Sequence, residues 1–278
     1  MEIRLLVLDI DGTIAGRSNE ISEPVKEAIK IAQTKGIQVA LATGRMYRSA
    51  MRFHASIDCQ LPIVVYNGAW IQDPFTEERH QHIPVPTVLA QQLLDDLEQP
   101  ELIDRLGIHF YIDDRLYVRQ ITSLTESYAQ RSGIEPIAVG DLRSLADKHP
   151  TKVLALSREI SLIQELLSHL QQRYDPNELY LTQSTVNFLE ATHPHANKGT
   201  ATRYLTEKIL GLEAKNVMAI GDNFNDVQML QYVGLSVAMG NAPTSVKELV
   251  DWVAPSVEED GVAVAIEKFL LSNDSVPN

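Results

Sequence analysis

Short apolar runs and helically spaced apolar residues alternate at both ends of the chain. Apolar runs bounded by polar residues predict buried strands, here over residues 3–8, 37–42, 62–66, 217–220 and 235–239. Helical spacing predicts helices over 24–35, 198–210 and 226–233. Ser22 is the expected N-cap of the first helix, and Gly36 is its expected end. This alternation predicts an α/β fold with a doubly wound parallel sheet, similar to a Rossmann core.

The middle of the chain has a pattern of its own. Between Asn67 and Lys198 lies far more chain than the dozen or so residues that a crossover needs. Helices are expected over 88–97 and 160–174, and strands over 109–112, 116–118, 152–156, 178–181 and 186–190. The sequence therefore predicts an inserted α+β domain at 83–190, within a core domain made of 1–82 and 191–278. A short polar tail follows Leu271.

Composition narrows the function classes. A length of 278 residues allows about two domains, and 44% hydrophobic residues allow a large core. The formal net charge of -13 argues against nucleic acid or an anionic membrane as partner. No run approaches the roughly 18 apolar residues of a membrane span. The single Cys59 cannot form an internal disulfide, and Asp9 interrupts the N-terminal apolar run too early for a signal peptide. We expect a cytoplasmic monomer.

Two carboxylates follow the first predicted strand. Asp9 and Asp11 are two positions apart, so they project to the same side of an extended chain and repel unless a cation or proton intervenes. The pair suits a carboxylate nucleophile, a neighbouring acid and base, and a hard divalent metal. The alternative is a polar strand exit into a turn at Gly12.

Other polar residues stand at comparable places. Thr43 follows the second strand, Asp222 and Asp226 follow a late strand, and Lys198 begins a helix. The carboxyl ends of parallel strands share one edge of the sheet, so these groups can converge. Each of these residues also has a non-catalytic explanation when it is considered alone. Thr43 could simply follow a strand, Lys198 could be a solvated lysine, and Asp222 and Asp226 could cap the helix that follows them. Their joint appearance in this order favours a site.

Four motifs resemble those of the haloacid dehalogenase superfamily. They are Asp9-Ile10-Asp11-Gly12-Thr13, Thr43, Lys198 and Gly221-Asp222-Asn223-Phe224-Asn225-Asp226. The insertion is similar in placement to the type-IIB cap of that superfamily, as in Cof-type sugar phosphatases and sucrose-phosphate phosphatases. The resemblance covers nearly the whole chain.

The resemblance implies a Mg²⁺-dependent phosphatase that hydrolyses a small phosphorylated metabolite, with a sugar phosphate as the expected class. Asp9 would attack phosphorus and form an aspartyl-phosphate, and Asp11 would protonate the leaving alcohol and then activate water. Asp9, Asp222 and the backbone carbonyl of Asp11 would hold the metal.

The resemblance also implies a phosphate-binding set. Its members are Thr43, Gly44, Arg45, Lys198 and Asn225. Asp226 would support Lys198 or a metal-bound water. Phosphoryl transfer depends mainly on positioning and charge neutralisation, and Lys198 with Mg²⁺ would supply the positive charge that the acidic chain otherwise lacks.

Three questions stay open at this level. The family's usual turn before Lys198 is replaced by residues 192–197, in which His193 or His195 could touch the substrate or simply be solvated. A phosphomutase of the phosphomannomutase type would share the motifs, but the few arginines of the predicted cap favour hydrolysis. A non-catalytic phosphate-ligand sensor is the third possibility.

Overall fold

The computed structural model describes residues 2–183 and 185–271, so the polar tail after Leu271 lies outside the described residues. The chain forms two compact units. The first unit contains the chain up to Gly44, Ala50–His80 and the chain from Asn197 onward. The second unit contains Arg45–Ser49 and Gln81–Ala196. The boundaries from the sequence, 82/83 and 190/191, lie two and six residues from these, and no sequence signal marks the short segment Arg45–Ser49.

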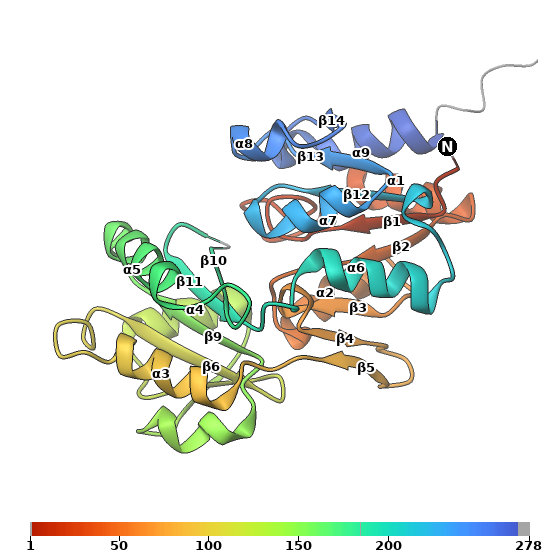
Figure 1. The fold of residues 1–278 in the computed structure, drawn as a ribbon. Coiled ribbons are helices and arrows are strands. Elements are labelled where there is room, and N and C mark those ends of the chain that lie inside the picture. Colours follow the sequence, from red (N-terminus) through yellow and green to blue (C-terminus); the bar gives the residue numbers. More distant parts are fainter. Residues whose placement is uncertain (1, 184, 272–278) are drawn as a thin grey trace, which may run out of the picture. The chain divides into compact units, whose positions relative to one another are not determined.

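A five-stranded parallel sheet forms the centre of the first unit, with the strand order β14-β13-β12-β1-β2 (Figure 1). The strands are β1 (Leu5–Leu8), β2 (Gln38–Leu41), β12 (Val217–Gly221), β13 (Leu235–Ala238) and β14 (Trp252–Val253). β1 and β12 are completely buried, which explains their uninterrupted apolar runs. The predicted α/β class is confirmed.

The register of this sheet brings the strand exits together. Leu8 pairs with Leu41 on one side and with Ile220 on the other. The residues that follow these three positions therefore leave the sheet at the same edge.

The helices of the first unit are α1 (Glu23–Thr34), α6 (Lys198–Tyr204), α7 (Val227–Tyr232), α8 (Thr244–Lys247) and α9 (Gly261–Ile266). α2 (Tyr47–Ser56) begins in the segment assigned to the second unit and continues into the first. α1 packs against α9, and α6 packs against α7. α6 continues into wider turns over Leu205–Ile209, in agreement with the predicted helix 198–210. Ser22 is the N-cap residue of α1, as predicted, but its hydroxyl donates to Asp260 Oδ1 at 2.6 Å and makes no capping hydrogen bond to the helix.

The third predicted strand differs from expectation. β3 (Ile63–Val65) belongs to a separate antiparallel sheet with β4 (Trp70–Gln72) and β5 (Arg79–His82). The reason is the tight turn at Tyr66–Gly68, which sends the chain straight back along β3. A single parallel bridge between Ala42 and Val64 still ties β3 to the end of β2.

The second unit contains a six-stranded, mostly antiparallel sheet. Its order is β10-β11-β9-β6-β7-β8, made of β6 (Gly107–Ile112), β7 (Arg115–Val118), β8 (Pro136–Ala138), β9 (Lys152–Leu156), β10 (Tyr180–Thr182) and β11 (Phe188–Thr192). Its helices are α3 (Thr87–Leu97), α4 (Ser123–Ser132) and α5 (Ile160–Arg173). α3 and α5 share an apolar core with one face of the sheet, to which β6 contributes Phe110. His109 and Tyr111 alternate to the other face, where α4 contributes Thr125 and Tyr128.

The structure also bears on Cys59 and on membrane-spanning helices. Cys59 is buried, and burial raises the pKa of its thiol to about 11. Within residues 2–183 and 185–271, every helix is too short or too polar to cross a membrane.

Candidate active site

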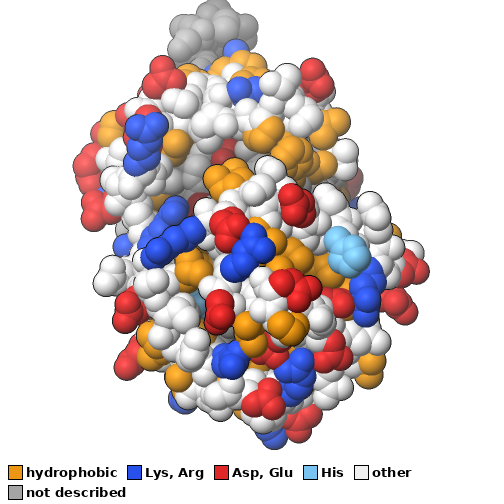
Figure 2. Space-filling model, turned by 90° about the vertical axis from the view of Figure 1, so that its left-hand side faces the viewer, with side chains coloured by type: hydrophobic (Ala, Val, Ile, Leu, Met, Phe, Trp, Pro, Cys, Tyr) orange, Lys and Arg blue, Asp and Glu red, His pale blue; other side chains and the backbone are white. Residues whose placement is uncertain are grey.

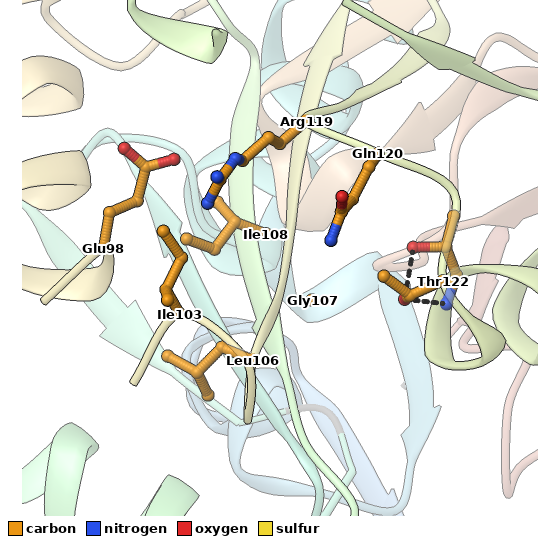
Figure 3. A pocket seen from close by; sticks show the side chains of 9 residues that line it. Glu98, Ile103, Leu106, Gly107, Ile108, Arg119, Gln120 and Thr122 are labelled. Carbon is orange, nitrogen blue, oxygen red and sulfur yellow. Dashed lines mark hydrogen bonds between the residues drawn. The ribbon is translucent and has the colours of Figure 1, made fainter. Parts of the chain in front are cut away.

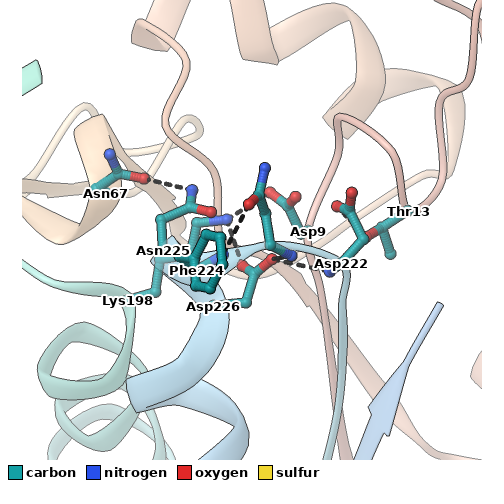
Figure 4. Close-up of polar contacts among 9 residues, drawn as sticks. Asp9, Thr13, Asn67, Lys198, Asp222, Phe224, Asn225 and Asp226 are labelled. Carbon is teal, nitrogen blue, oxygen red and sulfur yellow. Dashed lines mark hydrogen bonds and ion pairs between the residues drawn. The ribbon is translucent and has the colours of Figure 1, made fainter. Parts of the chain in front are cut away.

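A buried lysine links two of the predicted carboxylates. Lys198 begins α6, and its Nζ lies 2.6 Å from Asp9 Oδ1 and 2.6 Å from Asp226 Oδ1 (Figure 4). Lys198 and Asp226 are completely buried, and Asp9 is 4% exposed. Asp9 is held at the end of β1 because its N–H donates to the carbonyl of Ile220 in β12. The fold therefore brings Lys198 into contact with Asp9, which is 189 positions away in the sequence, and with Asp226, which is 28 positions away.

The second oxygen of Asp226 organises the loop after β12. Asp226 Oδ2 accepts hydrogen bonds from the backbone N–H groups of Asp222 and Asn223, at 2.9 and 3.0 Å. A Cβ at Gly221 would lie 2.6 Å from Asp226, so this close approach requires glycine. Asp226 is thus completely buried and held by Lys198 and two backbone N–H groups, which suits a supporting role.

Asp222 contacts the loop that follows β1. Its Oδ1 accepts a hydrogen bond from Thr13 Oγ1 at 3.1 Å, and its Oδ2 accepts one from Asn241 Nδ2 at 3.2 Å. Gly12 has a φ of +83°, and a Cβ there would lie 2.2 Å from Asp222 Oδ2. The two carboxylate-bearing loops therefore fit together only with glycine at position 12.

The charges of this cluster do not balance. Carboxylate oxygens of Asp9, Asp222 and Asp226 lie within 4.8 Å of one another, against the single Lys198. Burial acts to lower the pKa of Lys198, but Asp226 and Asp9 outweigh it and raise that pKa. Burial, reinforced by the neighbouring carboxylates and opposed by Lys198, raises the pKa of Asp9 well above its usual range. A hard divalent cation would relieve this repulsion, so the residues present fit Mg²⁺.

Asp222 shows the same imbalance. Burial first, and then Asp226, raise the pKa of Asp222 to about 7. On the face drawn in Figure 2, acidic and basic side chains are interspersed.

Three other predicted residues also lie in the first unit. Thr43 is buried after β2, and its N–H donates to the carbonyl of Val64 at 2.9 Å. Asn225 is buried, and its Nδ2 donates to Asn67 Oδ1 at 3.0 Å. Asp11 lies on the loop after β1 with an exposed side chain.

Three predicted residues belong to the second unit. Arg45 follows Gly44 directly, and its Nη1 lies 3.5 Å from Ser49 Oγ. The rings of His193 and His195 are 5.3 Å apart, and the N–H of His195 donates to His193 Nδ1. Burial, together with His195, lowers the pKa of His193. Substrate roles for these three residues stay predictions.

The sequence interpretation missed three contributors to the site. Thr13 and Asn241 bind Asp222, and Asn67 binds Asn225. The sequence analysis gave Thr13 no role within its motif, and Asn67 only marked the start of the inserted chain after the third predicted strand. A consecutive Asn-Gly after a buried strand is a turn signal, and it was the available clue.

The second unit has a pocket of its own (Figure 3). It is lined by Glu98, Ile103, Leu106, Gly107, Ile108, Arg119, Gln120, Thr122 and Thr125. Its charged side chains carry opposite signs, and Glu98 is already bound by Arg143. The described residues that line it include no member of the carboxylate cluster, so the cluster remains the candidate active site.

Comparison with known proteins places this geometry in a family. A family model described as haloacid dehalogenase-like hydrolase matches residues 6–266. The chain belongs to the haloacid dehalogenase-like hydrolases. The superfamily inferred from the four motifs is therefore confirmed, as is a hydrolytic enzyme.

This hydrolase is similar to several known proteins and solved structures. It is 30% identical over 277 residues to YxeH of Bacillus subtilis (strain 168), covering 97% of this chain and 99% of that protein. It is 28% identical over 275 residues to the 5-amino-6-(5-phospho-D-ribitylamino)uracil phosphatase YitU of the same organism, covering 95% and 97%. The solved subclass IIB sugar phosphatase BT4131 has a TM-score of 0.80 at 20% identity, covering 96% and 98%. The predicted type-IIB fold is confirmed.

Proposed function

We propose that this hydrolase is a Mg²⁺-dependent phosphatase that cleaves a small phosphorylated metabolite through an aspartyl-phosphate on Asp9. The observation that carries the proposal is the buried contact of Lys198 Nζ with Asp9 Oδ1 and Asp226 Oδ1, both at 2.6 Å. A carboxylate held by one oxygen keeps the other for attack on phosphorus. The neighbouring Asp222 supplies a further anionic ligand.

Asp9 and Asp11 divide the proposed chemistry between them. A bond forms between Asp9 and phosphorus while the bond from phosphorus to the ester oxygen breaks. Asp11 gives its proton to the departing alcohol. Asp11 then takes a proton from water, which attacks phosphorus, releases inorganic phosphate and regenerates Asp9. The exposed side chain of Asp11 suits proton exchange with both alcohol and water.

Asp9, Asp222 and the backbone carbonyl of Asp11 are the proposed metal ligands. Thr13 and Asn241 would orient Asp222 through their hydrogen bonds to its two oxygens. When bound, Mg²⁺ would neutralise negative charge on the transferring phosphoryl group.

Lys198, Thr43 and Asn225 are the proposed donors to phosphate oxygens, with Gly44 and Arg45 as further candidates. The first three are buried at the edge of the sheet, where water does not weaken their hydrogen bonds. The relative YitU is named for a substrate with a phosphorylated ribityl chain. A phosphate ester of a sugar or sugar alcohol is therefore the substrate class that we propose.

Phosphate release from a panel of metabolites tests the proposal. The panel contains sugar phosphates, sucrose 6-phosphate, pyridoxal phosphate and flavin mononucleotide, each with Mg²⁺ and with excess chelator. We expect metal-dependent release from one or a few members. Conversion of a hexose 1-phosphate to its 6-phosphate without release would instead establish the phosphomutase. Binding without either reaction would leave the sensor and contradict the proposal.

A further inference from the structure

The turn after β3 has an unusual backbone. Tyr66, Asn67 and Gly68 have successive φ values of 53°, 54° and 96°. Positive φ is uncommon outside glycine and costs on the order of 1 kcal/mol or more in a non-glycine residue. All three residues are buried, and the Tyr66 ring stacks on Trp70 at 5.9 Å. Surrounding packing therefore maintains a conformation that the isolated segment would avoid.

Asn67 contacts two of the proposed phosphate-binding residues. Its backbone N–H donates to the carbonyl of Thr43 at 2.9 Å. Its side-chain Oδ1 accepts from Asn225 Nδ2 at 3.0 Å (Figure 4). Asn67 and Asn225 are 158 residues apart in sequence, and both are buried. One strained residue thus connects the loops that follow β2 and β12.

Close packing holds the turn on both sides. A Cβ at Gly44 would lie 2.9 Å from Asn67 Oδ1. A Cβ at Gly68 would lie 2.5 Å from the carbonyl oxygen of Asn197, the N-cap of α6 that precedes Lys198. The turn is therefore fitted between the Thr43 loop and the start of the helix that carries the buried lysine.

We propose that Asn67 is a positioning residue that fixes the direction of the Asn225 carboxamide toward the phosphate. The two ends of a carboxamide are nearly identical in shape but opposite in hydrogen-bonding character. Because Asn67 Oδ1 is an acceptor, it requires Nδ2 of Asn225 on its side, and a flipped amide would bring two oxygens together. Nδ2 has two hydrogens, so the second stays available to a phosphate oxygen. The inference rests on the proposed function, since it assumes that Asn225 binds phosphate.

A double-mutant cycle tests this role. Asn67→Gly removes the side chain while glycine readily adopts the same positive φ. The cycle also needs Asn225→Ala and the double variant. Turnover is measured with p-nitrophenyl phosphate and Mg²⁺, and the affinity for inorganic phosphate by calorimetry. We expect Asn67→Gly to raise KM and weaken phosphate binding about fivefold to twentyfold, with a smaller change in kcat. In the Asn225→Ala background we expect less than about a twofold further change.

Asn19→Gly is the matched control. Asn19 also has a positive φ, 58°, and its backbone carbonyl, which glycine retains, accepts from Arg52 Nη2 at 3.1 Å. We expect unchanged phosphate affinity and KM. An equal loss from Asn67→Gly with and without Asn225, or a lower melting temperature with unchanged phosphate affinity, would overturn the inference. Phosphate affinity decides it even if the wild-type protein hydrolyses no ester, an outcome that would contradict the proposed function alone.

Discussion

Each unit of the molecule buries one lysine against carboxylates, and the two arrangements differ in balance. In the first unit, Lys198 faces Asp9 and Asp226, with Asp222 close by. In the second unit, Lys152 faces Glu190 at 3.0 Å, with both side chains 3% exposed. Among the described residues, one buried lysine thus compensates the charge of three carboxylates in the first unit and of one carboxylate in the second.

Uncharged aromatic side chains lie near Lys152 in the second unit. Lys152 also lies over the ring of Tyr111 at 4.9 Å, and the Tyr111 hydroxyl donates to that of Tyr128. His109 on the same sheet face is neutral, because burial, aided by Lys152, lowers its pKa to about 3. The second cluster is balanced within the protein, whereas the first keeps negative charge for an external cation. In this molecule, the buried lysine whose carboxylates outnumber it is the one in the candidate active site.

The largest expected effect is on catalysis in the first cluster. Asp9→Asn removes the nucleophile, and we expect kcat for p-nitrophenyl phosphate to fall by about 10⁴-fold or more. The free energy of unfolding should stay the same or increase. Burial disfavours the charged form of Asp9, and Lys198 retains its ion pair with Asp226 in the variant. Activity and urea unfolding measure the two effects.

Asp58→Asn is the control for that variant. Asp58 lies on the surface of the first unit, bonded to Gln60. It should retain full activity. Substantial turnover by Asp9→Asn would reject the nucleophile assignment, and a large loss of stability would reject the charge imbalance.

In the second cluster the same kind of change should act on stability. Glu190→Gln leaves a buried Lys152 without its carboxylate, and we expect the free energy of unfolding to fall by about 3 kcal/mol. Glu159→Gln is the control, because its partner Arg105 and Glu159 itself are both partly exposed. That change should lower the free energy of unfolding far less, because water screens the exposed pair. Similar losses in the two variants would show that burial does not distinguish the pairs.

The sequence predicted the first cluster better than the second for a physical reason. Asp9, Thr43 and Asp222 each follow an apolar run, and parallel strands bring such exits to one edge. The Lys152–Glu190 pair instead depends on the antiparallel register of β9 and β11, in which Lys152 and Glu190 are not opposite each other. A local pattern does not carry that register.

Two further misses have similar causes. α4 has Thr125 as its one fully buried residue among those described, so it lacks the apolar stripe that predicts a helix. The conformation of Asn67 depends on packing against Gly44 and on residues far along the chain. Tertiary contacts decide both features.

The pH dependence of stability should distinguish the clusters next. Without metal, the folded pKa of Asp222, about 7, is raised above its unfolded value near 4. The folded state therefore binds the proton more tightly. Its stabilising contribution is full below about pH 4 and is lost as pH rises toward 7. We expect wild-type stability in chelator to fall by on the order of 2 kcal/mol more than that of Asp222→Asn over this range.

Urea unfolding at several pH values gives that difference directly. The same measurement on Glu190→Gln and wild type gives the corresponding difference in the pH dependence of unfolding for the Lys152–Glu190 pair. Added Mg²⁺ should remove most of the pH-dependent loss in the wild type, because the metal replaces the proton. Parallel curves for wild type and Asp222→Asn would show that Asp222 is not perturbed.

The smallest expected effect comes from matched threonines. Thr13→Val removes the hydroxyl that donates to Asp222 Oδ1, so we expect Mg²⁺ affinity to fall about tenfold with kcat at saturating metal little changed. Thr192→Val in the second unit removes a buried hydroxyl for which the described residues provide no hydrogen-bond partner. It should leave metal affinity unchanged and stability equal or higher, because an unsatisfied polar group is lost. Metal titrations of activity and urea unfolding measure both. Equal Mg²⁺ affinities in the two variants would mean that Thr13 does not orient a metal ligand. The charge imbalance at Asp222 would then act on the metal without the hydrogen bond from the loop after β1.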